Sequence, residues 1–414
     1  MRVAVIGGGW AGIAAAVELT AGGAAVTLHE AGRVLGGRAR SVDIDGHTLD
    51  NGQHILLGAY RDTLALMRQV GADPDVLFDR RPLQVVDRGG FRLALPRLPA
   101  PLNVAWGLLT ASAVGWPEKL RTARWMQGIK RRNFVLDEDG SVADWLDAAG
   151  QTGSLRRNLW EPLCLAALNT PAERASARLF ANVLRDSLGS AQRADTDLLL
   201  PRTDLAQLLP TPAAAWLTAH GARLVLGHRV AAIEPLPGGV DIDGQTYDAA
   251  VLAVAPQHVA ALWPEIARPF DYEPIATVYL KFSPKSKLPF PLLKLPGPHG
   301  QWAVDRGDGL VACVLSGHGD WERLDDASLA ASLASELQMG QAASWRKVIR
   351  EKRATFSARP GLARPPETTI HPRLAVAGDY TWADYPATLE GAVRSGRRAA
   401  RLLLARGAGQ SAGN

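Results

Sequence analysis

Short apolar runs, each bordered by glycines or by a helix-forming stretch, mark both ends of this chain. Residues 2–6 form an apolar run typical of a buried strand, and residues 13–19 have the composition of a helix. A second apolar run covers residues 25–29, and two more cover residues 251–255 and 374–377. The first three elements predict a strand–helix–strand unit, and the later runs predict further core strands.

The middle of the chain has a different pattern, which predicts a second domain interleaved with the first. Residues 76–199 contain a short hairpin-like piece followed by helices with Trp and Leu, and residues 269–354 contain strand-like runs and one helix. The predicted fold class is α/β, with a Rossmann-type cofactor-binding domain and an α+β substrate domain that holds a mixed sheet and helices. The predicted cofactor-binding domain comprises residues 1–75, 200–268 and 355–406, and residues 407–414 are predicted to be a flexible tail.

The turn after the first strand carries a nucleotide-binding motif. Residues 7–12 fit G-x-G-x-x-G, in which the first glycine allows a tight turn, the second lets the backbone approach a pyrophosphate, and the third lets helix and sheet pack closely. The acid that ends the next strand can accept hydrogen bonds from ribose hydroxyls. The residues expected to contact the cofactor here are Gly7, Gly9, Trp10, Ala11, Gly12 and Glu30.

A second glycine pair after Glu30 indicates which dinucleotide is bound. Gly36 and Gly37 let the chain pass close to a cofactor, and Arg38 adds a charge-assisted hydrogen-bond donor. The spacing E-x-x-x-x-x-G-G-R resembles that of the flavoprotein superfamily that includes amine oxidases and phytoene desaturases. The resemblance implies that the cofactor is FAD.

The C-terminal strand and helix supply the other half of the expected site. The apolar run ends in Gly378 and Asp379, and the resemblance implies that this acid contacts the ribityl and phosphate region. The next helix begins near Thr388 and Leu389, and its N–H groups are expected to face the flavin ring edge, where negative charge grows on reduction. Two further contacts that the resemblance implies are Gly52, beside the ring, and Val230, at the adenine end.

Composition and charge predict a cytoplasmic globular enzyme. Of the 414 residues, 47% are hydrophobic and 21% are charged, which excludes a disordered chain. The formal net charge is +5, but no basic helix with interleaved aromatic residues is present, so nucleic acid is not an expected partner. Two cysteines, Cys164 and Cys313, are too few for a disulfide framework or a metal site.

Residues 98–132 join a long apolar stretch to a basic one. No charged residue occurs from Leu98 to Pro117, and six basic residues follow within 15 positions of Pro117. Such a segment either lies in a membrane interface or forms a buried helix of the substrate domain, and the sequence leaves both open. No run is long and apolar enough for a transmembrane helix, so the contact expected with the inner face of the cell membrane is peripheral.

Three further stretches resemble the hydroxysqualene dehydroxylases, which are flavin enzymes of bacterial hopanoid and squalene biosynthesis. They are residues 50–54, 159–170 and 386–396, and the resemblance extends nearly end to end. It implies that hydroxysqualene, a C30 isoprenoid, loses its allylic hydroxyl as water. A hydride from N5 of the reduced, non-covalently bound flavin then quenches the allylic cation to form squalene. No second nucleotide motif is present, so the electron donor is unknown.

This reaction needs a proton donor near the leaving oxygen and a dry apolar channel. Because residues 50–54 are expected to pass the flavin ring, Gln53 and His54 are candidates for binding or protonating the hydroxyl. Alternatively, His54 is a structural histidine bonded to the backbone. Tyr385 is a second candidate donor, and Asp50 is interpreted as structural. The candidate channel residues are Trp160, Leu163 and Asn169, the first two of which are equally typical of ordinary core.

Other activities of the superfamily stay open at this point. A phytoene-type desaturase would use the same cofactor domain to oxidise a long isoprenoid. A flavin amine oxidase is disfavoured, because such enzymes often attach flavin through a cysteine before the C-terminal helix, and no cysteine follows Cys313. They also tend to keep a lysine where this chain has Ile275. A non-enzymatic escort of prenylated proteins is disfavoured by the intact glycine motif, Glu30 and Asp379.

Overall fold

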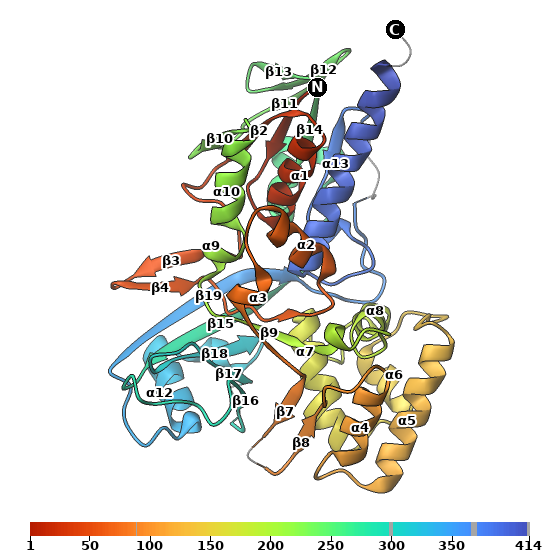
Figure 1. Cartoon of the computed structure of the whole chain (residues 1–414), viewed down its shortest axis with the longest axis vertical. Coiled ribbons are helices and arrows are strands. Elements are labelled where there is room, and N and C mark those ends of the chain that lie inside the picture. The colour runs from red at the N-terminus through yellow and green to blue at the C-terminus, as the bar shows by residue number, and fades with distance from the viewer. Residues whose placement is uncertain (88, 298–300, 366–370, 412–414) are drawn as a thin grey trace.

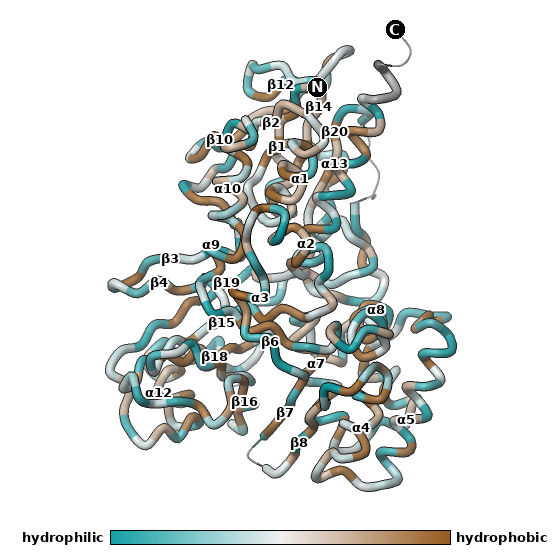
Figure 2. Tube along the Cα trace, in the orientation of Figure 1, coloured by the Kyte–Doolittle hydropathy of each residue, from teal (hydrophilic) through white to brown (hydrophobic). Residues whose placement is uncertain are grey.

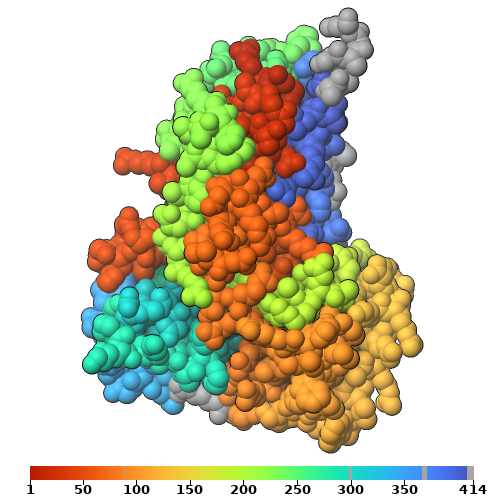
Figure 3. Space-filling view, in the orientation of Figure 1, coloured from red at the N-terminus to blue at the C-terminus, as the bar shows by residue number. Residues whose placement is uncertain are grey.

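The computed structural model shows an elongated molecule with an upper body and two lower lobes (Figure 1). The structure describes residues 1–87, 89–297, 301–365 and 371–411. The N-terminal and C-terminal segments, red and blue in Figure 3, adjoin in the upper body. Residues far apart in the sequence therefore build the body together.

The body is organised around a five-stranded sheet in which all strand pairs are parallel. Residues Arg2 to Ile6 pair with Ala25 to His29, which confirms the predicted strand–helix–strand unit. The sheet order is β10 (Arg223–Leu226), β2 (Ala25–Glu30), β1 (Arg2–Ile6), β14 (Ala249–Leu252) and β20 (Leu374–Val376).

The two faces of this sheet bury different side chains, because residues alternate along a strand. Val3 and Val5 pack with the helices on one face, whereas Ala4 and Ile6 belong to the core on the other face. The helices are α1 (Trp10–Ala21) and α13 (Leu389–Ser411), with α10 (Pro210–Ala219) beside them (Figure 1). An antiparallel sheet packs on the other face and consists of β11 (Ile233–Leu236), β12 (Gly239–Ile242) and β13 (Gln245–Tyr247).

Helices α1 and α13 approach each other closely. A Cβ on Gly396 would lie 2.1 Å from the carbonyl oxygen of Ala11, so only glycine permits this contact. The helix α13 continues to Ser411, which corrects the prediction of a flexible tail from residue 407. Gly407 and Gly409 are poor helix formers and favour an end there, but Ala405, Arg406 and Ala408 are good ones, and the helix continues past the last residue of the predicted domain. Residues 412–414 lie outside the described residues.

One lower lobe contains a second five-stranded sheet, in the order β16–β17–β18–β15–β19. Every pair in it is antiparallel, which corrects the predicted mixed sheet. The helix α12 (Asp326–Leu337) packs on this sheet, and the Asp325 carboxylate caps it by accepting from the Ser328 N–H at 2.7 Å. The strands are β15 (Tyr272–Lys281), β16 (Leu292–Lys294), β17 (Trp302–Asp305), β18 (Leu310–Ser316) and β19 (Trp345–Phe356).

The other lobe is mainly helical (Figure 1). Its most strongly amphipathic helix, α8 (Ala177–Asp186), begins at Ser176, whose Oγ accepts from the Leu179 N–H at 3.1 Å. A π-helical turn, Arg156–Trp160, leads directly into α7. The other helices of the lobe are α4 (Leu102–Thr110), α5 (Trp116–Arg131), α6 (Val142–Ala148) and α7 (Glu161–Leu168).

Short elements connect the body to the lobes. Figure 1 shows β3 and β4 projecting as a hairpin between the body and the β-sheet lobe. The remaining elements are β3 (Ser41–Ile44), β4 (His47–Asp50), β5 (Leu56–Leu57), α2 (Arg61–Gln69), α3 (Pro74–Leu77), β6 (Phe78–Arg81), β7 (Gln84–Val86), β8 (Arg92–Ala94), β9 (Leu198–Pro201), α9 (Leu205–Leu208) and α11 (Pro256–Leu262).

Candidate functional site

The glycine motif shapes the turn from β1 into α1. Gly7 has φ +104°, and a Cβ there would lie 2.5 Å from the carbonyl oxygen of Ala253. A Cβ on Gly12 would lie 1.8 Å from the carbonyl oxygen of Gly7, so side chains are excluded at both positions. For a Cβ on Gly9, in contrast, the nearest atom would be Gly37 Cα at 3.9 Å. The motif thus combines two crowded glycines with one open position.

The start of α1 fits the pyrophosphate of FAD. Gly9 caps the helix without a side-chain hydrogen bond, and the first turn contains no acidic residue. The unpaired N–H groups and the helix dipole at this end favour an anion. The Trp10 indole donates to the Ala39 carbonyl at 3.0 Å and so connects α1 to the loop that carries the second glycine pair. Ala11, the next residue of α1, is buried.

Glu30 is held in place at the end of β2. Its two carboxylate oxygens accept from the Gly8 N–H at 2.7 Å and from the Gly32 N–H at 2.6 Å. Each oxygen keeps a further lone pair, so a ribose hydroxyl could still be bound there. The chain after β10 runs alongside, since the His228 N–H donates to the Glu30 carbonyl at 3.0 Å. Val230 follows and is buried.

Arg38 joins the two predicted halves of the site. Its Nη2 donates to Asp379 Oδ2 at 2.6 Å, and its Nη1 donates to the Ala354 carbonyl at 2.7 Å. Burial opposes the charge of Arg38, but the Asp379 carboxylate outweighs burial, so the pKa of the guanidinium is raised. The preceding Gly36 N–H donates to the Gly8 carbonyl at 2.8 Å, beside the motif of α1. Residues from both ends of the chain therefore form one cluster.

The second half of the cluster lies at the end of β20. Gly378 is fixed by its N–H, which donates to Ser395 Oγ of α13 at 3.0 Å, and Asp379 accepts from the Tyr380 N–H at 3.0 Å. The helix α13 begins at Leu389, with Thr388 Oγ1 accepting from the Gly391 N–H at 3.0 Å as a cap. The carboxyl ends of parallel strands are where ligands bind in such sheets.

The predicted substrate-facing stretch follows β4 and contacts the β-sheet lobe. The Asp50 carboxylate is buried, accepts from the Leu205 N–H at 2.7 Å, and lies 3.1 Å from Arg306 Nη2. Its backbone carbonyl accepts from the Tyr279 hydroxyl at 2.9 Å. The Gln53 N–H approaches Thr277 Oγ1 at 3.4 Å. These contacts give Asp50 a structural position and anchor the stretch between the body and this lobe.

Gln53 presents an unused acceptor. Its Nε2 donates to the His54 carbonyl at 3.0 Å, whereas its Oε1 is buried and has no hydrogen-bond partner among the described residues. A buried acceptor without a partner is unfavourable unless a ligand completes it. An N–H of FAD or a substrate hydroxyl would complete it, and this orphaned oxygen fits a ligand site beside Gly52.

His54 is bonded to the backbone, as the structural alternative predicted. Its Nδ1 lies 2.7 Å from the Gly52 carbonyl oxygen, so Nδ1 carries the proton and Nε2 of the neutral ring is an acceptor. Burial lowers the pKa of His54. Near neutral pH, this histidine can accept a hydrogen bond from a hydroxyl more readily than it can protonate one.

Tyr385 is engaged with another part of the protein. Its hydroxyl donates to Asp186 Oδ2 at the end of α8, and the Arg394 guanidinium lies 4.9 Å from its ring centre. Burial, reinforced by Asp186, raises the pKa of Tyr385 and keeps its hydroxyl protonated. Nothing in the local sequence indicated Asp186 as the partner, because it precedes Tyr385 by 199 positions.

The candidate channel residues occupy the helical lobe. Trp160 is buried, its indole N–H has no partner among the residues that the structure describes, and its ring centre lies 5.3 Å from that of Trp125. Leu163 is half-buried against the same core. Asn169 ends α7 with φ 49°; its Nδ2 donates to Thr355 Oγ1 at 2.9 Å, and its Oδ1 accepts from the Gly317 N–H at 2.7 Å. Asn169 therefore connects α7 to the β-sheet lobe.

Comparison with known proteins identifies the class. The model of the flavin containing amine oxidoreductases matches residues 10–404, and the chain belongs to this family. It is accordingly an FAD-dependent oxidoreductase, which confirms the cofactor and superfamily predictions. A cyclohexylamine oxidase from Brevibacterium oxydans shares the fold, with a TM-score of 0.69, 18% identity, and 98% coverage of both chains.

Two relatives of this family are similar to the chain over nearly its full length. The chain is 32% identical to a hydroxysqualene dehydroxylase of Rhodopseudomonas palustris, over 98% of this chain and 99% of that protein. It is 26% identical to a zeta-carotene desaturase of Synechocystis, over 98% of this chain and 97% of that protein. The resemblance to hydroxysqualene dehydroxylases stated from the sequence is confirmed. Among the described residues, no helix has the length and apolarity needed to cross a bilayer.

Proposed function

We propose that this chain is a hydroxysqualene dehydroxylase, which reduces the C–OH of hydroxysqualene to C–H and so forms squalene. The observation that carries the proposal is the end-to-end likeness to a protein of that name, at 32% identity. The structure supports it with a Gln53 acceptor to which no described residue donates, on the stretch that links the cofactor body to the β-sheet lobe.

FAD would be held by the glycine motif, Glu30, Arg38, Asp379 and the start of α13. When bound and reduced, FAD supplies the two electrons of the reduction. A non-covalent cofactor is proposed because both cysteines are buried, and burial raises the pKa of the Cys164 and Cys313 thiols.

The hydroxyl of the substrate would be bound by two acceptors. We place Gln53 Oε1 and neutral His54 Nε2 around it, because no described residue donates to Gln53 Oε1 and the proton on His54 Nδ1 leaves Nε2 as an acceptor. The oxygen leaves as water, so it must gain a proton. Tyr385 is the proposed source, because its hydroxyl carries a proton that can turn from Asp186 toward the substrate. Burial and Asp186 raise its pKa and make it a weak acid, so the proton must move as the C–O bond breaks.

The C30 chain of the substrate would lie along apolar surface in the helical lobe, with Trp160 and Leu163 in contact. These two side chains share one continuous core with Ile6 of β1 and with Val230. Apolar walls exclude water and so protect a reactive cation. Asn169 would support this region by fixing the end of α7.

A second candidate is a carotenoid-type desaturase, which the likeness to zeta-carotene desaturase favours. The two activities differ in the direction of electron flow. A test would mix the anaerobic FAD-reduced protein with hydroxysqualene, and the oxidised protein with zeta-carotene, while following flavin absorbance. Reoxidation of the reduced flavin by hydroxysqualene supports the dehydroxylase proposal. Reduction of the oxidised flavin by zeta-carotene supports the desaturase proposal. If neither substrate changes the flavin in detergent, both proposals fail.

A further inference from the structure

Large apolar side chains are exposed mainly on one part of the helical lobe. Trp116 is 62% exposed and Trp106 is 52% exposed, values far from those of core tryptophans. The exposed side chains from residues 98 to 120 are Leu98, Leu102, Trp106, Leu109, Trp116 and Leu120. Residues 98–132, which include α4 and α5, are called the α4–α5 surface below.

The helix α4 turns its apolar side outward. Leu102, Trp106 and Leu109 have the spacing i, i+4 and i+7, which places them on one stripe of the helix. Asn103 and Gly107 are buried on the side that faces the protein. Figure 2 shows hydrophobic positions along α4, near the end of the molecule away from the parallel sheet. The alternative that this stretch is a buried helix does not hold for this stripe.

Positive charge is concentrated on the same surface. Residues 98–132 contain six basic residues against one acidic residue, Glu118, a net charge of +5 that equals that of the whole chain. The Glu118 carboxylate faces inward, because it accepts from the Leu155 N–H at 2.6 Å. Arg124 and Arg131 are exposed and form no ion pair with any described residue. The rest of the chain is neutral in sum, and Asp137, just beyond the segment, pairs with Arg132 at 2.5 Å, so the excess positive charge of this surface is carried by its other basic residues.

Lysine and tryptophan are arranged together at the junction of α4 and α5. Lys119 Nζ donates to the Leu109 carbonyl at 2.7 Å and lies 5.2 Å from the ring centre of Trp116. This contact fixes the end of α4 against α5. It also places an ammonium group beside an exposed indole, the combination found where a protein meets lipid headgroups.

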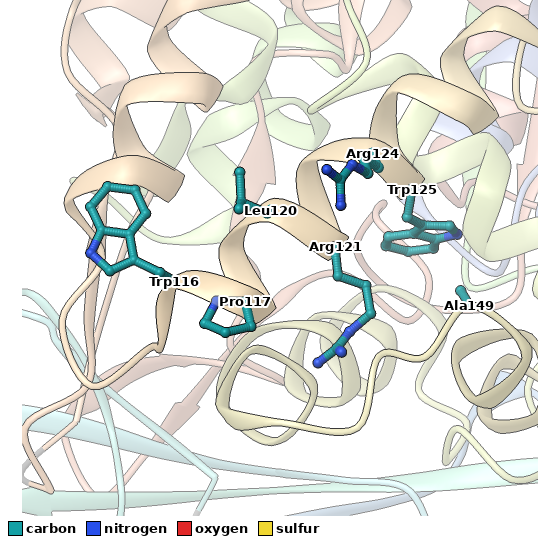
Figure 4. Close-up of a pocket in the computed structure, with 7 residues that line it drawn as sticks. All are labelled: Trp116, Pro117, Leu120, Arg121, Arg124, Trp125 and Ala149. Atoms are coloured by element: carbon teal, nitrogen blue, oxygen red, sulfur yellow. The ribbon is translucent and has the colours of Figure 1, made fainter.

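An open depression of about 730 Å³ lies on α5 (Figure 4). Its lining is apolar apart from Arg121 and Arg124, whose side chains Figure 4 shows along the helix. Trp125 lines it and contacts Trp145 at 5.0 Å and Trp160 at 5.3 Å between ring centres. The depression is therefore part of the α4–α5 surface, and Trp125 connects it to Trp160 of the proposed substrate region.

We propose that the α4–α5 surface binds the face of an anionic phospholipid bilayer, with the stripe of α4 and Trp116 in the headgroup–acyl boundary and the basic residues over the headgroups. Apolar insertion and electrostatic attraction act together in such contacts. A second copy of the chain is a poorer occupant, because a symmetric contact would bring two surfaces of net charge +5 together. The proposal stands on this surface alone and does not require the proposed reaction.

The test is co-sedimentation of the FAD-loaded protein with vesicles of phosphatidylcholine alone or mixed with phosphatidylglycerol. Binding is expected only to the mixed vesicles and should weaken with added salt. Leu102→Ser/Trp106→Ser should bind about tenfold more weakly, because the apolar insertion is lost. Arg124→Gln/Arg131→Gln should bind the mixed vesicles more than tenfold more weakly, because two of the six basic residues are lost, and Trp106→Phe should retain binding.

Val76→Ser/Leu226→Ser is the matched control, because these side chains are also exposed and apolar but lie outside the surface. Circular dichroism and flavin content confirm that each variant is folded. Equal binding by the Leu102/Trp106 variant and the wild type, or no vesicle binding by the wild type, would overturn the proposal. The proposal would also be overturned if the wild type formed a dimer without vesicles and the Leu102/Trp106 variant did not. Each of these results is independent of substrate turnover in detergent.

Discussion

Replacing Arg38 by methionine tests whether both ends of the chain form one cofactor site. The guanidinium contacts Asp379 at 2.6 Å, and the two side chains are 35% and 7% exposed. With about 4 Å between charge centres and an effective dielectric constant of about 20, their attraction is about 4 kcal/mol. Solvent screening at Arg38 reduces this value, so we expect the variant to lose about 2 kcal/mol of unfolding free energy.

The measurement is urea unfolding of Arg38→Met, Asp379→Asn and the double variant, together with FAD titration. The double variant should lose about 1 kcal/mol less than the sum of the single variants, because the residues interact directly. FAD affinity of Arg38→Met should fall about tenfold or more. Arg33→Met is the control, since Arg33 is exposed nearby. Additive single effects, or unchanged FAD affinity in Arg38→Met, would refute the shared site.

Three further predictions concern the turn and the substrate-facing stretch. Gly12→Val should abolish FAD binding and lower the yield of folded protein, because its side chain would overlap the Gly7 carbonyl. Gly128→Ala is the control, because this position on α5 has open space around it, and it should change neither property. Flavin absorbance of the purified variants measures FAD binding. Gln53→Leu should lower kcat/KM about tenfold with unchanged flavin content, because it removes an acceptor for the hydroxyl; an unchanged kcat/KM would exclude that role. Burial lowers the pKa of His54 below 6.5, so the unfolded state takes up its proton first and stability should fall as pH drops below 6.5. His54→Gln should flatten that part of the Tm-against-pH curve, and an identical curve would contradict the reasoning.

The cofactor half of the molecule could be predicted because its signals are local. Gly7, Gly12 and Glu30 occupy fixed positions in one strand–helix–strand unit, and the sterics that require them act over a few residues. Arg38 and Asp379 could each be predicted from their own neighbours. The resemblance placed both at one flavin site, but their direct contact was not predicted, because nothing in either segment specifies a partner more than 300 residues away.

The rest of the site depends on contacts that leave no local pattern. Asp186 lies at the end of a helix, and only the folded chain brings it to the Tyr385 hydroxyl. Asn169 was expected beside the substrate, but its amide connects α7 to β19 and to the turn after β18. Strand pairing across β15, β18 and β19 depends on register between distant segments, so the antiparallel arrangement was also missed.

The segment 98–132 shows how structure decides between two readings of one pattern. Its apolar and basic residues were equally consistent with a buried helix and with a membrane interface. Exposure of Leu102, Trp106 and Leu109 on one stripe separates the two, because a buried helix would turn that stripe inward. Periodicity alone could not show which side faced the protein.

The most direct test of the proposed function is a single-turnover measurement with the FAD-loaded protein. The protein is fully reduced without oxygen, mixed with excess hydroxysqualene in detergent, and its lipids are extracted for mass spectrometry. We expect one squalene to form for each flavin reoxidised, with Gln53→Leu forming it more slowly. Hydroxysqualene recovered unchanged, while the flavin stays reduced in several detergents, would contradict it.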